Sequence, residues 1–228
     1  GENLTAFLSF IYKKQLGTFL TNPQAFRFLN SIDECYSNLL KPNIIHENFH
    51  TVGFIDRSHS IYRAACATAL AGQHTETFIL IRPIIENAAI ALNIHVQPSL
   101  SEVFDNRHNP PDGLSNSKDA FQNKNLQNVI KQINPNIGNA YKIIYDYCVD
   151  FGSHPNPGSF YTGMELKKDS NTVGILYSSV GDEKQARSLK ILAQAGLCGL
   201  RIYQLILYEK FRQLGIDSII TATISDLK

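Results

Sequence analysis

The sequence lacks a strong excess of charge of either sign. Its 228 residues include 21 lysines and arginines and 20 aspartates and glutamates, which gives a formal net charge of +1. A balance this even provides no general electrostatic attraction to nucleic acids or acidic membranes. Hydrophobic residues make up 43% of the chain and charged residues 18%. This composition is typical of globular proteins and not of disordered ones.

Paired cysteines are also missing. No C-x-x-C motif occurs, and the cysteines stand far apart among apolar residues: Cys35, Cys66, Cys148 and Cys198. The pattern argues against a disulfide framework or a cysteine zinc cluster, and it favours core thiols in a reduced compartment. We therefore expect a cytoplasmic protein.

No uninterrupted apolar run is long enough to span a membrane. The longest candidate, residues 189–207, is interrupted by Lys190, Gln194, Arg201 and Gln204, so it predicts a buried helix and no membrane partner. The sequence also contains no P-loop, no G-x-G-x-x-G and no G-x-S-x-G. These absences exclude the common phosphate-binding loops and the hydrolase nucleophile elbow.

Hydrophobic residues recur mainly with helical periodicity. After Asn22-Pro23, apolar residues return at spacings of three and four as far as Leu39, which is typical of the buried face of a helix. The segment 75–96 is strongly apolar, and Pro83 within it is expected to kink the helix or to begin a second one. Further helices are expected near residues 58–71, 120–133 and 137–151 and from Asp182 onward.

Turn-forming residues at 152–158 end the helical pattern before two short β-prone segments, 161–167 and 172–178. In the final helix, small residues gather at 195–199 and would let a neighbouring helix approach closely. We predict one all-α domain over residues 1–228, a helical bundle with one small β-hairpin insertion near residues 161–178.

Residues 46–50 match the pattern H-E-x-x-H through His46, Glu47 and His50. On a helix, two histidines at this spacing can hold one zinc ion while the glutamate activates the bound water. With Gly53 and Asp56 the match extends and resembles the metzincin active-site stretch, in which Asp56 would be the third ligand. The helical residues before it do not provide the sheet of metzincins. A zinc-dependent peptidase is therefore the alternative hypothesis, and no cofactor is favoured.

A second group of polar residues stands on otherwise apolar helices. Arg82 and Glu86 are four residues apart and share one helix face. A buried ion pair is costly unless its polar atoms are satisfied, so this pair is either a lock between helices or part of a site. Asp150 and His154 show the same spacing. The carboxylate would orient the imidazole, which could then gain or lose a proton near neutral pH. The simpler alternative is that His154 only caps its helix.

Two further positions complete the predicted site. Arg107-His108 lies in a loop-rich region, and Asn156 lies in a turn. We assign the chemistry to His154, Asp150 and Glu86. We assign ligand binding to Arg82, Arg107, His108 and Asn156.

These motifs resemble a family of bacterial helical proteins that carry an R-x-x-x-E helix followed by D-x-G-(A/S)-H-P-N. The matching stretches are residues 82–86 and 150–156, and the resemblance spans residues 58–160. It implies a helical fold with a shared polar cluster and no particular reaction. A wider resemblance is to HEPN-type helical domains of RNA-cutting toxins, but their R-x4–6-H pair is absent. RNA chemistry would need Arg82 or Arg107 to meet His154 through tertiary packing.

The sequence thus predicts a helical protein with a polar site for a small molecule or RNA, and it leaves open whether the protein is an enzyme. The zinc-dependent peptidase is one alternative. The other is a non-catalytic interaction module that forms a homodimer through the small residues of its final helix.

Overall fold

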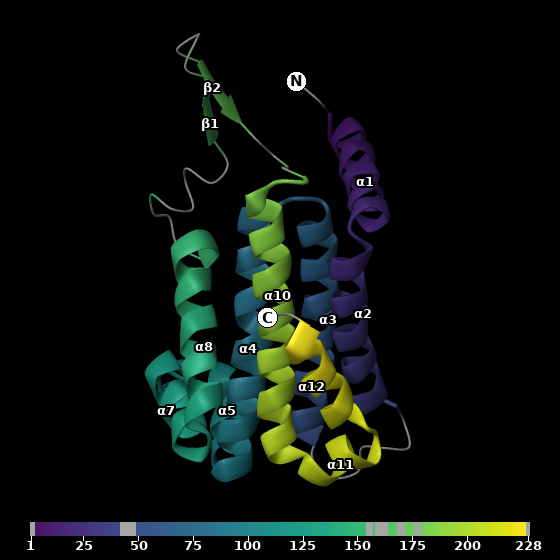
Figure 1. Ribbon diagram of the computed structural model, residues 1–228. Coiled ribbons are helices and arrows are strands. Elements are labelled where there is room, and N and C mark those ends of the chain that lie inside the picture. The colour runs from purple at the N-terminus through teal and green to yellow at the C-terminus, as the bar shows by residue number, and fades with distance from the viewer. Residues whose placement is uncertain are drawn as a thin grey trace.

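The computed structural model describes residues 3–41, 49–153, 164–167, 172–175 and 180–226, together with Pro157 and Ser178. These residues form a bundle of helices (Figure 1), which confirms the all-α prediction. In chain order the longer helices are α1 (Leu4–Thr21), α2 (Pro23–Leu39), α3 (Phe49–Leu70), α4 (His74–Val96), α7 (Asn123–Ile133), α8 (Pro135–Cys148), α10 (Glu183–Ile206) and α12 (Ile216–Asp226). The shorter ones are α5 (Leu100–Asp105), the 3₁₀ turn η1 (Asn106–His108), α6 (Gly113–Ala120), the π turn η2 (Val149–Ser153) and α11 (Tyr208–Gln213).

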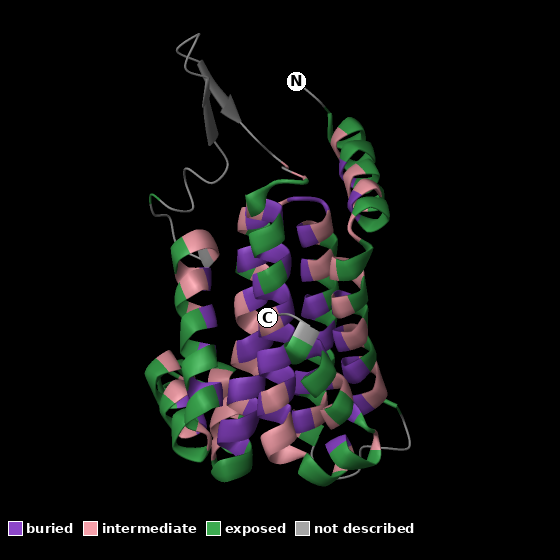
Figure 2. Cartoon of the chain, viewed as in Figure 1, coloured by how far each residue is buried: buried purple, intermediate pink, exposed green. Residues whose placement is uncertain are grey.

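Helix α4 lies at the centre of the bundle and packs most extensively against α3 and α10. Figure 2 shows the buried residues concentrated where these helices face one another. Ile81, Ile84 and Ile85 of α4 are fully buried. Among the described helices, α4 alone is long and apolar enough to cross a membrane, with a mean hydropathy of 1.4, and 61% of its apolar window is buried in the bundle.

Pro83 lies inside one continuous helix, so the expectation that a second helix begins there is wrong. A proline removes the hydrogen bond to the carbonyl four residues earlier, which belongs to Ile79. The helix nevertheless continues through Pro83 as far as Val96.

The small residues of α10 pack inside the bundle. A β-carbon added to Gly196 would lie 2.7 Å from Cε2 of Tyr62, and one added to Gly199 would lie 2.5 Å from the hydroxyl oxygen of Tyr36. The predicted close approach of a helix is confirmed, but the neighbours are α2 and α3 of the same chain. Both glycines are buried inside the single chain, and the expected homodimer stays a prediction.

Two short strands fall within the range expected for a hairpin. β1 (Met164–Lys167) and β2 (Thr172–Ile175) pair antiparallel, with Met164 opposite Ile175 and Lys167 opposite Thr172 (Figure 1). The other residues of the range 161–177 lie outside the described part of the chain.

Candidate functional site

The Arg82–Glu86 pair lies on the side of α4 that faces α8. Nε of Arg82 donates to Oε1 of Glu86 at 2.8 Å, and the two side chains are 28% and 26% exposed. The predicted shared face is thus confirmed. Because Glu86 accepts from Nε, the edge with the two terminal nitrogens has the geometry that binds a carboxylate or phosphate in two parallel hydrogen bonds.

Partial burial and the carboxylate act in opposite directions on this arginine. Burial alone would lower the pKa of Arg82, but the hydrogen bond and the attraction of Glu86 outweigh it and raise the pKa above its ordinary value. The guanidinium therefore keeps its positive charge although the protein shields most of its surface.

An aromatic side chain of α8 contacts the guanidinium group of Arg82. Cζ of Arg82 lies 4.9 Å from the ring centroid of Tyr145, which is a cation–π contact. Tyr145 stacks on Tyr141, with ring centroids 6.1 Å apart and planes 21° apart. The hydroxyl of Tyr141 donates to Oδ1 of Asn123 on α7 at 2.9 Å. We call Arg82, Glu86, Tyr141 and Tyr145 the α4–α8 cluster.

A glycine fixes the end of α8 against α4. In η2, a β-carbon on Gly152 would lie 2.7 Å from the backbone nitrogen of Ile79 and from Cβ of Phe78. No larger residue allows this approach without movement of the α4 backbone. η2, which directly follows α8, therefore contacts α4 about one turn before Arg82, and π turns are frequent at functional sites.

The structure does not place two other predicted site residues, Arg107 and His108, in contact with this cluster. Nη1 of Arg107 donates to Oγ of Ser117 on α6 at 3.0 Å, and His108 is exposed. Within the described ranges, no hydrogen bond, ion pair or ring contact joins either residue to Arg82 or Glu86. Arg107 instead connects η1 to α6.

The remaining part of the predicted site is described only at its beginning. Asp150 lies in η2 and is exposed. His154 and Asn156 follow η2 in the sequence and lie outside the described residues, so the predicted pairing of Asp150 with His154 stays a prediction.

The residues of the zinc hypothesis are also described in part. His46 and Glu47 lie outside the described residues. His50, in the first turn of α3, hydrogen-bonds through Nε2 to Oδ1 of Asp105 on α5 at 2.9 Å, and Asp56 is exposed further along α3. In the part of the chain that the structure describes, no three histidine, cysteine or acidic side chains lie close enough to hold a metal ion.

The sequence did not indicate a pocket of about 370 Å³ that lies beside His50, between α3, α4 and α5. The rings of Phe54 and Phe104, with centroids 5.0 Å apart, form its apolar side. Arg57 and Asn87 add polar groups. Nδ2 of Asn87 is shielded from solvent and has no hydrogen-bond partner among the residues that the structure describes, which is unusual for a buried donor. No sequence motif connects these residues, because they come from three helices.

A second cluster that sequence reasoning missed joins α2 to α3. Nε and Nη2 of Arg63 donate to the two carboxylate oxygens of Asp33 at 2.7 and 2.9 Å, and Nε2 of His59 lies 2.7 Å from Oδ1 of Asp33. Burial raises the pKa of Asp33, but the hydrogen bonds to Arg63 and His59 outweigh burial and hold the pKa below its ordinary value. The spacing of four between His59 and Arg63 was the only signal in the sequence.

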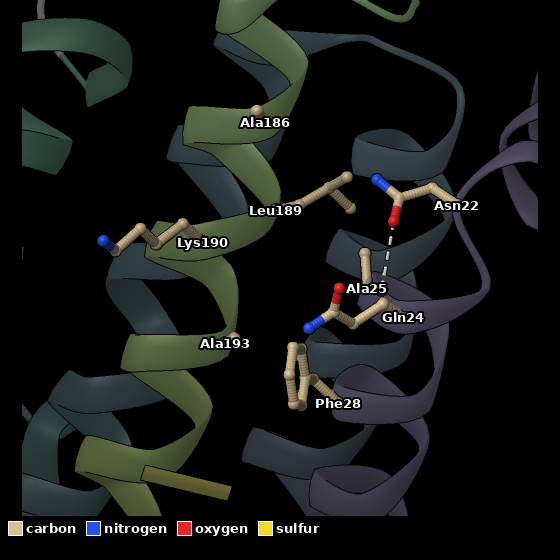
Figure 3. Close-up of a pocket in the computed structure, with 8 residues that line it drawn as sticks. All are labelled: Asn22, Gln24, Ala25, Phe28, Ala186, Leu189, Lys190 and Ala193. Atoms are coloured by element: carbon tan, nitrogen blue, oxygen red, sulfur yellow. Dashed lines mark hydrogen bonds between the residues drawn. The ribbon is translucent and has the colours of Figure 1, made fainter. Parts of the chain in front are cut away.

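Figure 3 shows a groove of about 210 Å³ between α2 and α10. Oδ1 of Asn22 accepts a hydrogen bond from the backbone nitrogen of Ala25 at 3.1 Å, so this side chain caps α2. The side chain of Lys190 points away from α2. The groove therefore presents few polar groups that are not already used by the fold.

In comparisons of this chain with known proteins, no protein-family model, curated protein or solved structure matches it.

Proposed function

We propose that the protein binds a small anionic ligand, with a phosphate or carboxylate group, at the α4–α8 cluster. The observation that carries this proposal is the Arg82 guanidinium, which is three-quarters buried, keeps its charge, and is held by Glu86 at 2.8 Å and by the Tyr145 ring at 4.9 Å. A cation fixed on two sides loses little side-chain entropy when an anion binds it.

The roles within this proposal follow from the contacts. Glu86 positions Arg82 through Nε, and the terminal nitrogens of Arg82 bind the anion. Tyr145 supports the guanidinium plane. Asp150, His154 and Asn156 come next in the sequence after α8, and we assign them to further contacts with the same ligand, with Asp150 orienting His154.

The charge distribution favours a small anion over RNA. Nucleic-acid sites depend on several arginines and lysines along a surface, whereas the net charge is +1 and the α4–α8 cluster pairs its one arginine with a glutamate. The cysteines support a cytoplasmic location for this function, because they form no disulfide with one another and reduced cysteines are typical of that compartment.

Calorimetric titration of the full chain with inorganic phosphate, a nucleoside monophosphate, a dicarboxylate and a short single-stranded RNA tests the proposal. We expect at least one of the small anions to bind. Arg82→Gln should weaken it more than about tenfold, and Arg82→Lys should weaken it less, because a charge without the planar fork remains.

Arg107→Gln is the matched control, because it removes the same charge outside the cluster. If Arg107→Gln weakens binding as strongly as Arg82→Gln, the α4–α8 cluster is not a separate site. If only RNA binds, or if no probe binds below about 1 mM, the proposal of a small-anion site is wrong.

A further inference from the structure

Helix α1 exposes a row of large hydrophobic side chains. Leu4, Leu8, Tyr12, Leu16 and Leu20 follow one another at a constant spacing of four residues, and their exposed fractions lie between 46% and 70%. Residues four apart form one ridge along a helix surface. We call these five residues the α1 ridge.

The rest of the bundle covers little of α1. Only Ile11 and Thr18 of this helix are buried, and Figures 1 and 2 show α1 extending past the end of the bundle with most of its surface exposed. Phe19, three residues after Leu16 and therefore next to the ridge, is 42% exposed. Contiguous apolar surfaces of this kind mark interaction sites in soluble proteins.

The exposed apolar area approaches what a stable dimer needs. The exposed fractions of the ridge residues, with Phe19, correspond to about 600 Å² of apolar surface on each chain, given typical side-chain areas of about 150–250 Å². A specific interface of standard size buries about 800 Å² on each partner.

The pattern of the ridge indicates the partner. Ridges with a spacing of four pack into the equivalent grooves of a second helix at a crossing angle of about −50°, and a two-fold dimer requires a surface that complements itself. The ridge meets that requirement because its spacing is the same along its whole length. We propose that two copies of this chain form a homodimer in which their α1 ridges pack against each other.

Tyr12 is the middle residue of the ridge and therefore lies closest to the two-fold axis. Lys13 and Lys14 follow it in the sequence, and α1 contains no acidic residue. Nζ of Lys14 lies 5.2 Å from the ring centroid of Phe10 on its own helix. Two helices that carry only positive charge repel each other, so the dimer becomes tighter as salt screens that repulsion. An acidic partner or an anionic lipid surface would instead be released by salt.

Sedimentation velocity of the full chain at about 1–100 μM, at low and at high salt, tests the proposal. We expect a monomer–dimer equilibrium that shifts toward the dimer at high salt. Leu8→Glu and Leu16→Glu should each weaken it about tenfold to a hundredfold, because each places a charge in an apolar contact. Leu114→Glu is the matched control: Leu114 is also an exposed leucine, at 47%, but lies on α6.

Cooperative thermal unfolding verifies that the bundle of each variant is folded. A second readout is oxidation of Tyr12→Cys, which should give a disulfide-linked dimer, whereas Ser60→Cys on the exposed face of α3 should not.

A wild-type chain that stays monomeric at 100 μM overturns the proposal, and binding to anionic vesicles by that monomer would identify lipid as the occupant. A dimer that persists in both glutamate variants also overturns it. Arg82→Gln should leave the dimer intact, so this result is independent of the anion site.

Discussion

The hydroxyl of Tyr36 occupies the space beside Gly199 that a β-carbon would need. The two atoms would be 2.5 Å apart, and the same hydroxyl donates to the carbonyl oxygen of Gly196 at 3.2 Å. One tyrosine of α2 thus both fills and hydrogen-bonds the small-residue patch of α10. The patch allows two helices of one chain to approach, and its glycines are required by that contact.

Gly199→Ala should therefore destabilise the protein by about 1–3 kcal/mol, because overpacking in a core exceeds the gain of about 1 kcal/mol in helix propensity. Urea unfolding measures the change. Gly53→Ala on the exposed face of α3 is the control, since nothing lies within 4 Å of its added β-carbon. This variant should gain about 0.5–1 kcal/mol. A Gly199→Ala protein as stable as the wild type would contradict the described contact.

The Asp33 cluster should make stability depend on pH in the acid range. The pKa of Asp33 is lowered from an ordinary value of 3.8, so the folded state favours the ionised carboxylate. Its contribution is complete well above pH 3.8 and is lost as the pH falls through the lower, folded pKa. The unfolding free energy of Asp33→Asn should therefore be smaller than that of the wild type at pH 6.

The difference between the two proteins should shrink as the pH falls from about 5 to 3. Asp56→Asn on the exposed side of α3 should follow the wild-type curve throughout. A constant difference between Asp33→Asn and the wild type would show that ionisation of Asp33 is not coupled to folding.

A double-mutant cycle measures the coupling between Arg82 and Glu86. With both side chains three-quarters buried, we expect Arg82→Met and Glu86→Met to show a coupling of about 1 kcal/mol in the unfolding free energy. The double variant should be more stable than either single variant, because no charge is left unpaired. A coupling near zero would mean that the pair does not hold together in solution.

Asn87→Leu should leave stability unchanged or raise it by about 1 kcal/mol, because it removes a shielded amide donor that has no hydrogen-bond partner within the described ranges. Thermal unfolding with Asn93→Leu as the comparison tests this. Nδ2 of Asn93 donates to the carbonyl oxygen of Ala89 at 2.9 Å, and its loss should cost stability. A clear loss in Asn87→Leu would mean that this amide has a partner in solution.

The native thiols should resist modification. Burial raises the pKa of all four cysteines to about 12, and only the thiolate reacts readily. A disulfide reagent at pH 8 should label none of them within minutes in the native protein and all four in denaturant. Cys66 is half-buried and should react first if local opening occurs. Fast labelling of any cysteine under native conditions would contradict its burial.

Sequence patterns predicted the features that depend on neighbours along one helix. Asn22-Pro23 was expected to begin a helix, and Oδ1 of Asn22 caps α2. Asp182 was expected to open the final helix, and its side chain accepts from the backbone nitrogen of Gln185 at 2.9 Å. The Arg82–Glu86 pair belongs to the same class, because a spacing of four residues fixes its geometry.

Contacts between helices were not predictable in this way. His50 pairs with Asp105 and Arg63 with Asp33 across different helices, and no local spacing encodes such pairs. The small residues of α10 predicted a close helix neighbour but not which one, since α2 and a second chain satisfy the same pattern. Arg107 was grouped with Arg82 by residue type, whereas its position depends on the turn that joins η1 to α6.

The scarcity of buried residues in α1 has a consequence for its helix–coil equilibrium. An isolated helix of 18 residues is only marginally stable in water, and the two buried side chains of α1 add little to that. The backbone amides of α1 should therefore exchange their hydrogens far faster than those of α4 in dilute protein. In the proposed dimer their protection should rise with concentration, because a second copy would cover the α1 ridge.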